Sequence, residues 1–192
     1  MQQSFFFDNE INIYDKDNFI IHDGNRIVYE ILTSGSLYNN NVFLLTGKKG
    51  SGKTYMCNIW KNIKTNKEKF VLEDIENTKM SEEDLLHFIN NTNHGILLIT
   101  SCRKLNDFNF ILPDLQSRFR NFYNIKLLDI NNDEIKKQIL LKLLNDKQLK
   151  LSDNNIDCIV EKISANYETI IDFVNKLNEC KKIDKEQIKG LL

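Results

Sequence analysis

The sequence predicts an α/β protein with a parallel sheet of about four strands, followed by a small domain made of helices alone. Two observations predict this class. Strand-length apolar runs alternate with amphipathic helical segments as far as about residue 129, the order expected of a parallel sheet with crossover helices. From Asn131 onward the periodicity is helical throughout. We therefore expect a flexible polar arm at 1–17, a sheet domain at 18–129 and a helical domain at 130–192.

The expected strands and helices follow in chain order from hydrophobic periodicity and capping residues. Short, continuous apolar runs are typical of strands buried on both faces of a parallel sheet, and they occupy 42–46, 70–72, 95–101 and 122–128. Helical periodicity covers 25–32, 54–63, 114–119, 134–145, 153–163 and 167–180, with a terminal turn at 185–191. Ser81 and the acids behind it start a further helix, and Asp23 or Asn25 is expected to cap the first one.

Charge and composition exclude several kinds of protein. The 26 basic and 27 acidic residues give a net charge of −1, whereas a domain that holds DNA through its phosphates shows a basic excess or stripe. We therefore expect no direct sequence-specific DNA binding. The longest apolar runs have strand length, and the N-terminus lacks the basic region and apolar core of a signal peptide. The four cysteines lack metal-site spacing, so we expect a cytoplasmic chain with reduced thiols and no membrane contact.

Residues 47–54 (GKKGSGKT) carry the strongest functional motif. They match G-x-x-x-x-G-K-[ST] between a predicted strand and a predicted helix, which is the context that a phosphate-binding loop requires. The glycines let backbone N–H groups surround a phosphate, Lys53 reaches the β- and γ-phosphates, and the Thr54 hydroxyl ligates Mg²⁺. The predicted nucleotide-binding residues of the loop are Gly47, Gly50, Ser51, Gly52, Lys53 and Thr54. The expected cofactors are ADP or ATP with Mg²⁺, and the alternative is a scaffold that binds no nucleotide.

Further polar residues stand where P-loop proteins place catalytic groups. Glu73 and Asp74 end the second strand, a position that predicts a metal ligand in Glu73 and a water-activating base in Asp74, or else an acidic helix cap. Because aspartate is shorter than glutamate, we expect weak hydrolysis. Thr100 ends the third strand and is either a contact of the γ-phosphate or a strand cap. Arg118, on a short predicted helix, is either supplied in trans to a neighbour's γ-phosphate or a plain surface charge.

Several segments resemble the DnaA-type AAA+ proteins of the P-loop class. The residues NFIIHDGN at 18–25 are similar to the family's segment before its first helix, and LPDLQSRF at 112–119 is similar to its arginine-finger box. The start of the family's helical lid resembles residues 141–149. Together with 47–54 and 73–76 the likeness spans nearly the whole chain. Within the family the chain looks most like the regulatory inactivators of DnaA (Hda), in the short form seen in alphaproteobacteria.

The resemblance implies a P-loop AAA+ sheet with a helical lid, in which Asn25 joins the nucleotide-binding residues. It also implies a regulator of chromosomal replication initiation that presents Arg118 to ATP bound on the initiator DnaA, with weak or no intrinsic ATPase activity. Gln3, Phe5, Phe6 and Phe7 resemble the family's peptide for the DNA polymerase III sliding clamp (beta subunit), and the alternative is a hydrophobic tail or a strand docked on its own domain. The competing function is a stand-alone AAA+ ATPase acting in DNA replication or repair.

Three departures from the family pattern have structural consequences. Only residues 55–69 separate the loop from the second strand, so a single crossover helix is expected and the outermost strand of the family's sheet is lost. No arginine follows Arg120, so the lid arginine expected around 165–168 (ANYE) is absent. His22 stands where the family commonly has glycine.

Overall fold

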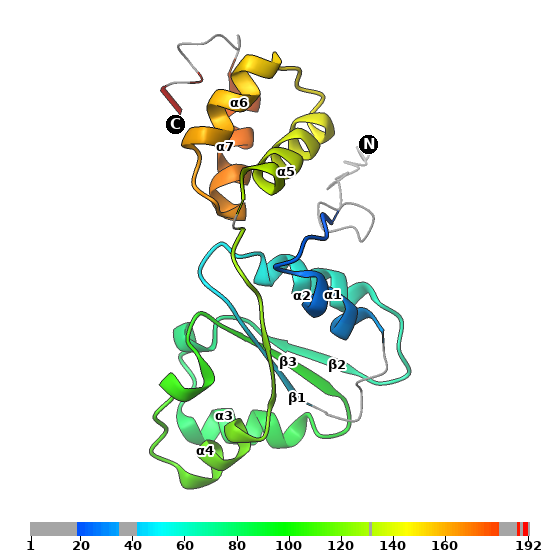
Figure 1. Cartoon of the computed structure of the whole chain (residues 1–192). Helices are drawn as coiled ribbons and strands as arrows, with labels where there is room; N and C mark the ends of the chain where they lie inside the picture. The colour runs from blue at the N-terminus through cyan, green and yellow to red at the C-terminus, as the bar shows by residue number, and fades with distance from the viewer. Residues whose placement is uncertain (1–18, 35–41, 131, 181–187, 189, 192) are drawn as a thin grey trace, which may run out of the picture.

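A computed structural model describes residues 19–34, 42–130, 132–180, 188 and 190–191. These residues form a domain of sheet and helices with a domain of helices beyond it (Figure 1). The predicted clamp peptide, from Gln3 to Phe7, lies outside the described residues, as does most of the predicted terminal turn at 185–191.

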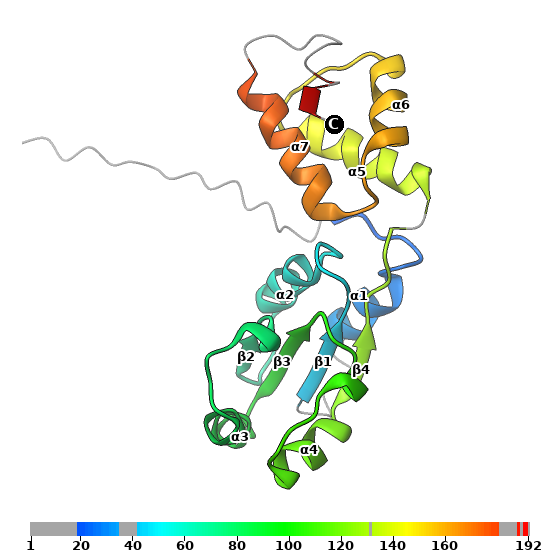
Figure 2. The same cartoon turned by 90° about the vertical axis from the view of Figure 1, so that its left-hand side faces the viewer.

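The sheet has four parallel strands in the order β2-β3-β1-β4. The strands are β1 (Val42–Thr46), β2 (Lys69–Leu72), β3 (Ile96–Ser101) and β4 (Tyr123–Lys126). Figure 2 shows them side by side with their carboxyl ends directed toward the helical domain. Because β1 lies between β3 and β4, its middle residues are almost fully buried. The four-stranded parallel sheet confirms the predicted fold class, although β4 is shorter than the predicted run at 122–128.

Helices cover both faces of the sheet, and alternate strand residues divide between the two apolar layers. On one side lie α1 (Arg26–Thr33) and α2 (Lys53–Asn62), and on the other α3 (Glu82–Asn91) and α4 (Pro113–Arg120) (Figure 1). Because successive strand side chains point to opposite faces, Phe43 and Leu45 pack in the first layer and Leu44 in the second. Two 3₁₀ turns, η2 (Ile75–Asn77) and η3 (Leu105–Asp107), follow β2 and β3.

A single crossover helix, α2, joins β1 to β2, as the short spacing predicts. Among the described strands β2 lies at the edge of the sheet, so nothing in the core depends on a strand beyond it. The Lys69 ammonium donates to the carbonyls of Trp60 and Ile63 and lies 4.8 Å from the centroid of the Trp60 ring. A cation at the carboxyl end of a helix satisfies its last carbonyls. Lys69 therefore ends α2 and starts β2.

The second domain is formed by α5 (Asp133–Asp146), α6 (Asp153–Lys162) and α7 (Tyr167–Glu179), close to the predicted ranges. These helices enclose an apolar cluster of their own, formed by residues from 130 onward with Ile20 packed against it. The buried Lys136 joins α5 to the end of α6, since its Nζ donates to the carbonyls of Val160 at 2.6 Å and Ile163 at 3.3 Å.

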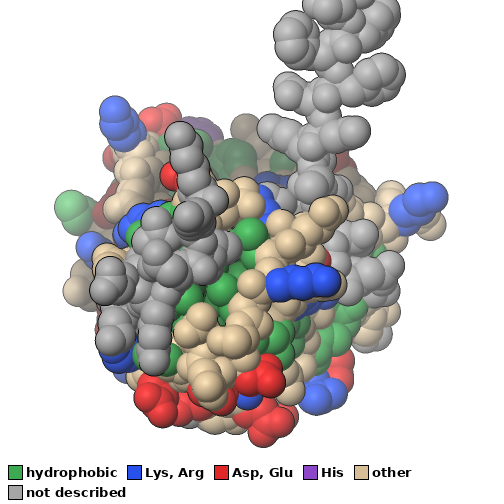
Figure 3. Space-filling view, turned by 90° about the horizontal axis from the view of Figure 1, so that it is seen from above, with side chains coloured by type: hydrophobic (Ala, Val, Ile, Leu, Met, Phe, Trp, Pro, Cys, Tyr) green, Lys and Arg blue, Asp and Glu red, His purple; other side chains and the backbone are tan. Residues whose placement is uncertain are grey.

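From above, apolar side chains are visible toward the middle of the helical domain, with acidic and basic side chains around them (Figure 3). In the described part of the chain, every helix is too short or too polar to cross a membrane.

Candidate functional site

The loop between β1 and α2 has the geometry of a phosphate cradle, and each of its glycines has a physical reason. Gly50 and Gly52 have φ values of +73° and +97°, in the left-handed region that favours glycine. A Cβ on Gly47 would lie 2.7 Å from Ser51 Oγ and 3.1 Å from the Leu127 carbonyl oxygen, so there is no room for a side chain. The loop therefore requires glycine at each of the three predicted positions.

Lys53 is buried at the first turn of α2, with 6% of its surface exposed. Its Nζ donates to the carbonyls of Gly47 at 2.9 Å and Lys48 at 3.0 Å, and lies 3.2 Å from Cys102 Sγ. The partners of the ammonium are all neutral groups, so an anionic ligand can compete with them for its N–H donors. Ser51 Oγ is buried and has no hydrogen-bond partner within the described residues, so it too is available to a ligand.

A cavity of about 400 Å³ opens over the loop, between the carboxyl ends of the strands and α7. This edge of an open parallel sheet is where α/β proteins bind ligands. The lining residues with polar side chains are Lys49, Lys53, Thr54, Tyr55, Asp74, Asn77, Cys102, Tyr167, Glu168 and Asp172. The cavity thus brings together three predicted site residues, Lys53, Thr54 and Asp74. Helix α7 adds the carboxylates of Glu168 and Asp172 and no cation.

The two predicted acids after β2 point to different surroundings. Glu73, the predicted metal ligand, pairs with Lys61 Nζ at 3.1 Å and does not line the cavity. Asp74, the predicted base, does line it. Its backbone N–H donates to Thr100 Oγ1 at 2.8 Å, and its φ of +48° turns the chain sharply. Thr100 is buried and holds the backbone of Asp74, which corresponds to the strand-cap alternative.

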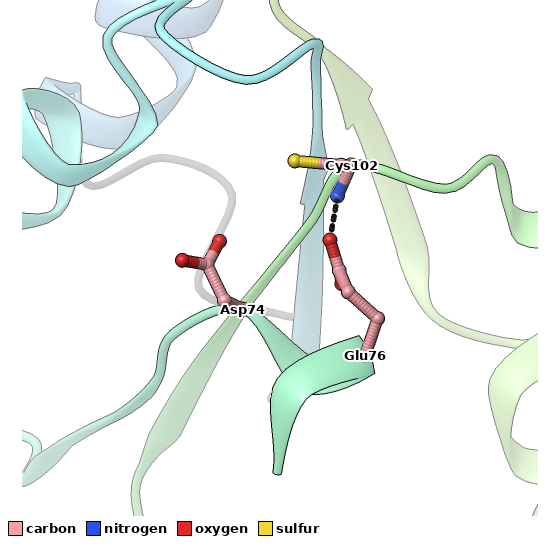
Figure 4. A group of neighbouring side chains, drawn as sticks. All are labelled: Asp74, Glu76 and Cys102. Atoms are coloured by element: carbon pink, nitrogen blue, oxygen red, sulfur yellow. Dashed lines mark hydrogen bonds between the residues drawn. The ribbon is translucent and has the colours of Figure 1, made fainter.

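Two residues that sequence reasoning missed complete this corner of the site. One ligand atom from each of Asp74, Glu76 and Cys102 lies within 4.8 Å of the others (Figure 4). Glu76 reaches from η2 to accept a hydrogen bond from the Cys102 backbone N–H at 2.6 Å. Burial alone would raise the pKa of the Glu76 carboxyl, but hydrogen bonds led by that N–H outweigh burial and lower the pKa. Glu76 is therefore ionised at neutral pH and adds negative charge beside Asp74.

The donors present fit a hard divalent cation. Mg²⁺ prefers carboxylate and hydroxyl oxygens and retains several waters. The carboxylate of Asp74 and the hydroxyl of Thr54 line one cavity, and the ionised Glu76 lies beside it. The sequence position of Glu76 and Cys102 could have indicated their place in the site. Cys102 directly follows the polar end of β3, and Glu76 comes two residues after Asp74.

Asn25 lies under the helical domain and not in the cavity lining. Its Oδ1 accepts from the His22 backbone N–H at 2.8 Å, and its Nδ2 donates to the Ile20 carbonyl at 2.9 Å and contacts the Tyr167 hydroxyl at 3.4 Å. It occupies the N-cap position of α1, as expected, but its side chain makes no capping hydrogen bond. Asn25 instead fastens the segment before α1 to the first residue of α7.

The start of α7, where the lid arginine is absent, lies directly on the phosphate loop. The Tyr167 backbone N–H donates to the Gly50 carbonyl at 3.0 Å, and Asn166 Nδ2 donates to the Lys49 carbonyl at 3.0 Å. Burial raises the pKa of the Tyr167 phenol, so this ring stays neutral. The helical domain therefore holds the loop carbonyls through two neutral donors, and the exposed ion pair of Lys49 Nζ with Glu168 Oε1 at 3.9 Å adds a charged contact.

Arg118 lies apart from its own chain's cavity. It is exposed on α4, while Leu115 and Phe119 on the same helix are buried. Within the described residues it has no ion pair. The start of α4 is held by Glu82, whose carboxylate accepts from the backbone N–H groups of Ile111 at 3.0 Å and Leu112 at 2.7 Å. The guanidinium is thus free and is carried on an anchored helix.

Comparison with known proteins bears on the fold. No protein-family model and no curated protein matches the sequence. Domain III of the replication initiation protein DnaA from Thermotoga maritima superposes with a TM-score of 0.75 at 18% identity, covering 94% of this chain and 96% of that one. AMPPCP-bound DnaA from Aquifex aeolicus has a TM-score of 0.72 at 17% identity, covering 93% and 70%.

A second kind of structural neighbour is the RuvB Holliday junction branch migration motor of Thermotoga maritima. Its TM-score is 0.64 at 15% identity, covering 93% of this chain and 70% of that one. At these identities the likeness concerns the fold. The chain shares the fold of these DnaA and RuvB structures, with a parallel sheet followed by a domain of helices.

Proposed function

We propose that this protein is a nucleotide-binding regulator of chromosomal replication initiation that stimulates hydrolysis of ATP bound to the initiator DnaA. In this proposal it binds ADP or ATP with Mg²⁺ at its own loop and supplies Arg118 in trans. The observation that carries the proposal is that Arg118 lies away from the cavity over its own phosphate loop. It is exposed on α4, whose start is held by Glu82.

Nucleotide binding is supported by the loop itself. Its glycine geometry, the buried Lys53 and the hydroxyl of Thr54 are the groups that bind the phosphates and the magnesium ion of a nucleotide. One solved structure of the same fold, DnaA from Aquifex aeolicus, is bound to AMPPCP. We infer that ADP or ATP occupies the corresponding cavity here.

Weak hydrolysis by the isolated protein is supported by the charges of the cavity. Its lining has the ammonium groups of Lys49 and Lys53 but no arginine, and α7 contributes the carboxylates of Glu168 and Asp172. An arginine at the γ-phosphate accelerates hydrolysis by about 10³- to 10⁵-fold in P-loop enzymes. A protein whose cavity lacks an arginine is expected to hydrolyse ATP slowly. Arg118 could instead supply the arginine that the cavity of a partner needs.

The proposed partners are DnaA and the sliding clamp (beta subunit of DNA polymerase III). Contact with the clamp is assigned to Gln3 and Phe5–Phe7, because a glutamine followed by aromatic residues supplies anchors for an apolar pocket. Truncation of these residues should abolish clamp binding and leave nucleotide binding unchanged. Unchanged clamp binding would contradict this part of the proposal.

The experiment that tests the proposal measures hydrolysis of ATP pre-bound to the cognate DnaA in the presence of DNA-loaded clamp. The wild-type protein should stimulate hydrolysis and Arg118→Ala should not. Arg120→Ala is the matched control, because Arg120 is exposed on the same helix. No stimulation by the wild type, or equal stimulation by Arg118→Ala, would refute the proposed role.

The second candidate is a stand-alone AAA+ ATPase acting in DNA replication or repair. Asp74 lines the same cavity as Lys53, which favours this candidate because an acid there can activate water. This candidate predicts brisk ATP turnover by the purified protein alone, abolished in Asp74→Asn. Slow turnover that is unaffected by Asp74→Asn would reject it.

A further inference from the structure

We propose that Asn166 and Tyr167 are positioning residues that hold the phosphate loop in its anion-binding shape from the helical domain. The inference rests on the proposed nucleotide binding, and it concerns how the loop is kept ready and how the two domains are coupled. Two hydrogen bonds make this contact. Asn166 Nδ2 donates to the Lys49 carbonyl, and the Tyr167 N–H donates to the Gly50 carbonyl; together they are called the latch.

The latch fixes the orientation of two consecutive peptide units. In a trans peptide the C=O and the N–H point in opposite directions. Because the Lys49 carbonyl is directed to Asn166, the Gly50 N–H points away from it. That N–H makes no hydrogen bond within the described part of the chain, so it is free for an anion. The Gly50 carbonyl is likewise drawn to Tyr167, while the next N–H, of Ser51, donates to the Lys48 carbonyl at 3.2 Å.

This orientation matters because a flipped peptide would present a carbonyl oxygen to the phosphate. Successive backbone N–H groups form the concave cradle that binds an anion, and a carbonyl oxygen in that cradle repels it. Gly50 is conformationally permissive, so without an external partner its flanking peptides would sample more than one orientation. The latch removes that freedom before the nucleotide arrives.

The fit at the latch is close. A Cβ on Gly50 would lie 2.0 Å from Asn166 Oδ1, and a Cβ on Gly52 would lie 3.4 Å from Tyr167 Cδ2. Asn166 is also the N-cap of α7, where its Oδ1 accepts from the Thr169 N–H at 3.3 Å. One side chain thus starts the helix with its oxygen and holds the loop with its amide nitrogen.

The latch has a specific consequence for nucleotide preference. An arginine from the lid would bind the γ-phosphate and so favour ATP over ADP. The latch bonds to loop carbonyls that are the same whichever nucleotide is bound. Loss of the latch should therefore weaken ADP and ATP equally, and nucleotide binding should in turn strengthen docking of the helical domain.

The test uses the full chain with Asn166→Ser. Serine is as good an N-cap as asparagine but has no amide that could reach the Lys49 carbonyl. The matched control is Asn132→Ser, since Asn132 caps α5 in the same way, accepting from the Ile135 N–H at 2.8 Å. The dissociation constants of ADP and ATP with Mg²⁺ are measured by calorimetry for each variant, together with the melting temperature without nucleotide.

We expect Asn166→Ser to raise both dissociation constants by a similar factor of about 3- to 10-fold, the effect of one hydrogen bond. Asn132→Ser should leave both unchanged, because it alters a helix cap in the same way but removes no contact with the loop. Equal constants for Asn166→Ser and the wild type, or a change confined to ATP, would overturn the latch. Failure of the wild-type protein to bind either nucleotide would instead overturn the proposed nucleotide binding on which the latch depends.

Discussion

Glu82 should anchor the helix that carries Arg118, and Glu82→Gln measures how strongly. The carboxylate accepts two backbone hydrogen bonds, from Ile111 and Leu112, and the Leu112 bond is partly buried. Hydrogen bonds to a charged group each contribute about 1.5–3 kcal/mol, less where water competes. Glutamine keeps one neutral acceptor oxygen, so we expect a loss of about 1–2 kcal/mol in the free energy of unfolding.

Glu83→Gln is the matched control for this prediction. Glu83 lies in the same first turn of α3 and is favoured by the same helix dipole, but it is exposed and no hydrogen bond joins it to the loop before α4. Urea unfolding of both variants should show the larger loss for Glu82→Gln, and stimulation of DnaA-bound ATP hydrolysis should fall only in that variant. Equal unfolding free energies for the two variants would refute the reasoning.

Three further predictions follow from the loop and from the buried histidine. Lys53→Ala should abolish the rise in melting temperature produced by ADP, which at 100 times the dissociation constant corresponds to about 2.7 kcal/mol; a retained rise would place the nucleotide elsewhere. Gly50→Ala should cost about 1–2 kcal/mol or more in stability because of its positive φ, whereas Gly190→Ala, with open space around it, should cost little. Burial lowers the pKa of His22 below 6.5, so the unfolded chain binds more protons as the pH falls below that value and the folded state loses stability there. Unfolding at pH 7.5 and 5.5 should show a smaller difference for His22→Gln than for the wild type, and an equal difference would contradict this assignment.

Periodicity predicted the fold well because burial and sequence agree along most of the chain. The runs that form β1 and β3 are apolar on both faces, and both strands lie inside the sheet with helices on each side. The phosphate loop was equally readable, since its motif is contiguous in the sequence and the positive φ values of Gly50 and Gly52 are a local requirement for glycine.

The corner beyond β2 was harder to read because backbone direction changes there. Strand alternation assigns side chains to faces only while the chain stays extended, and Asp74 has a left-handed backbone. Glu73 therefore turns to Lys61, while Glu76, from a 3₁₀ turn, approaches Cys102. The contact of Asn25 with the helical domain was not predicted either, because its partner Tyr167 lies 142 positions away in the sequence.

The edge position of β2, among the described strands, also bears on how readily the sheet could pair with another chain. An uncovered edge strand offers unpaired backbone groups to other chains, and proteins protect such edges by keeping them short and charged. Here β2 has four residues, starts with Lys69, and is preceded by Glu68, which pairs with His94 at 2.9 Å. The shortened sheet thus ends in a strand that is a poor template for aggregation. Its edge therefore does not require a further strand to protect it.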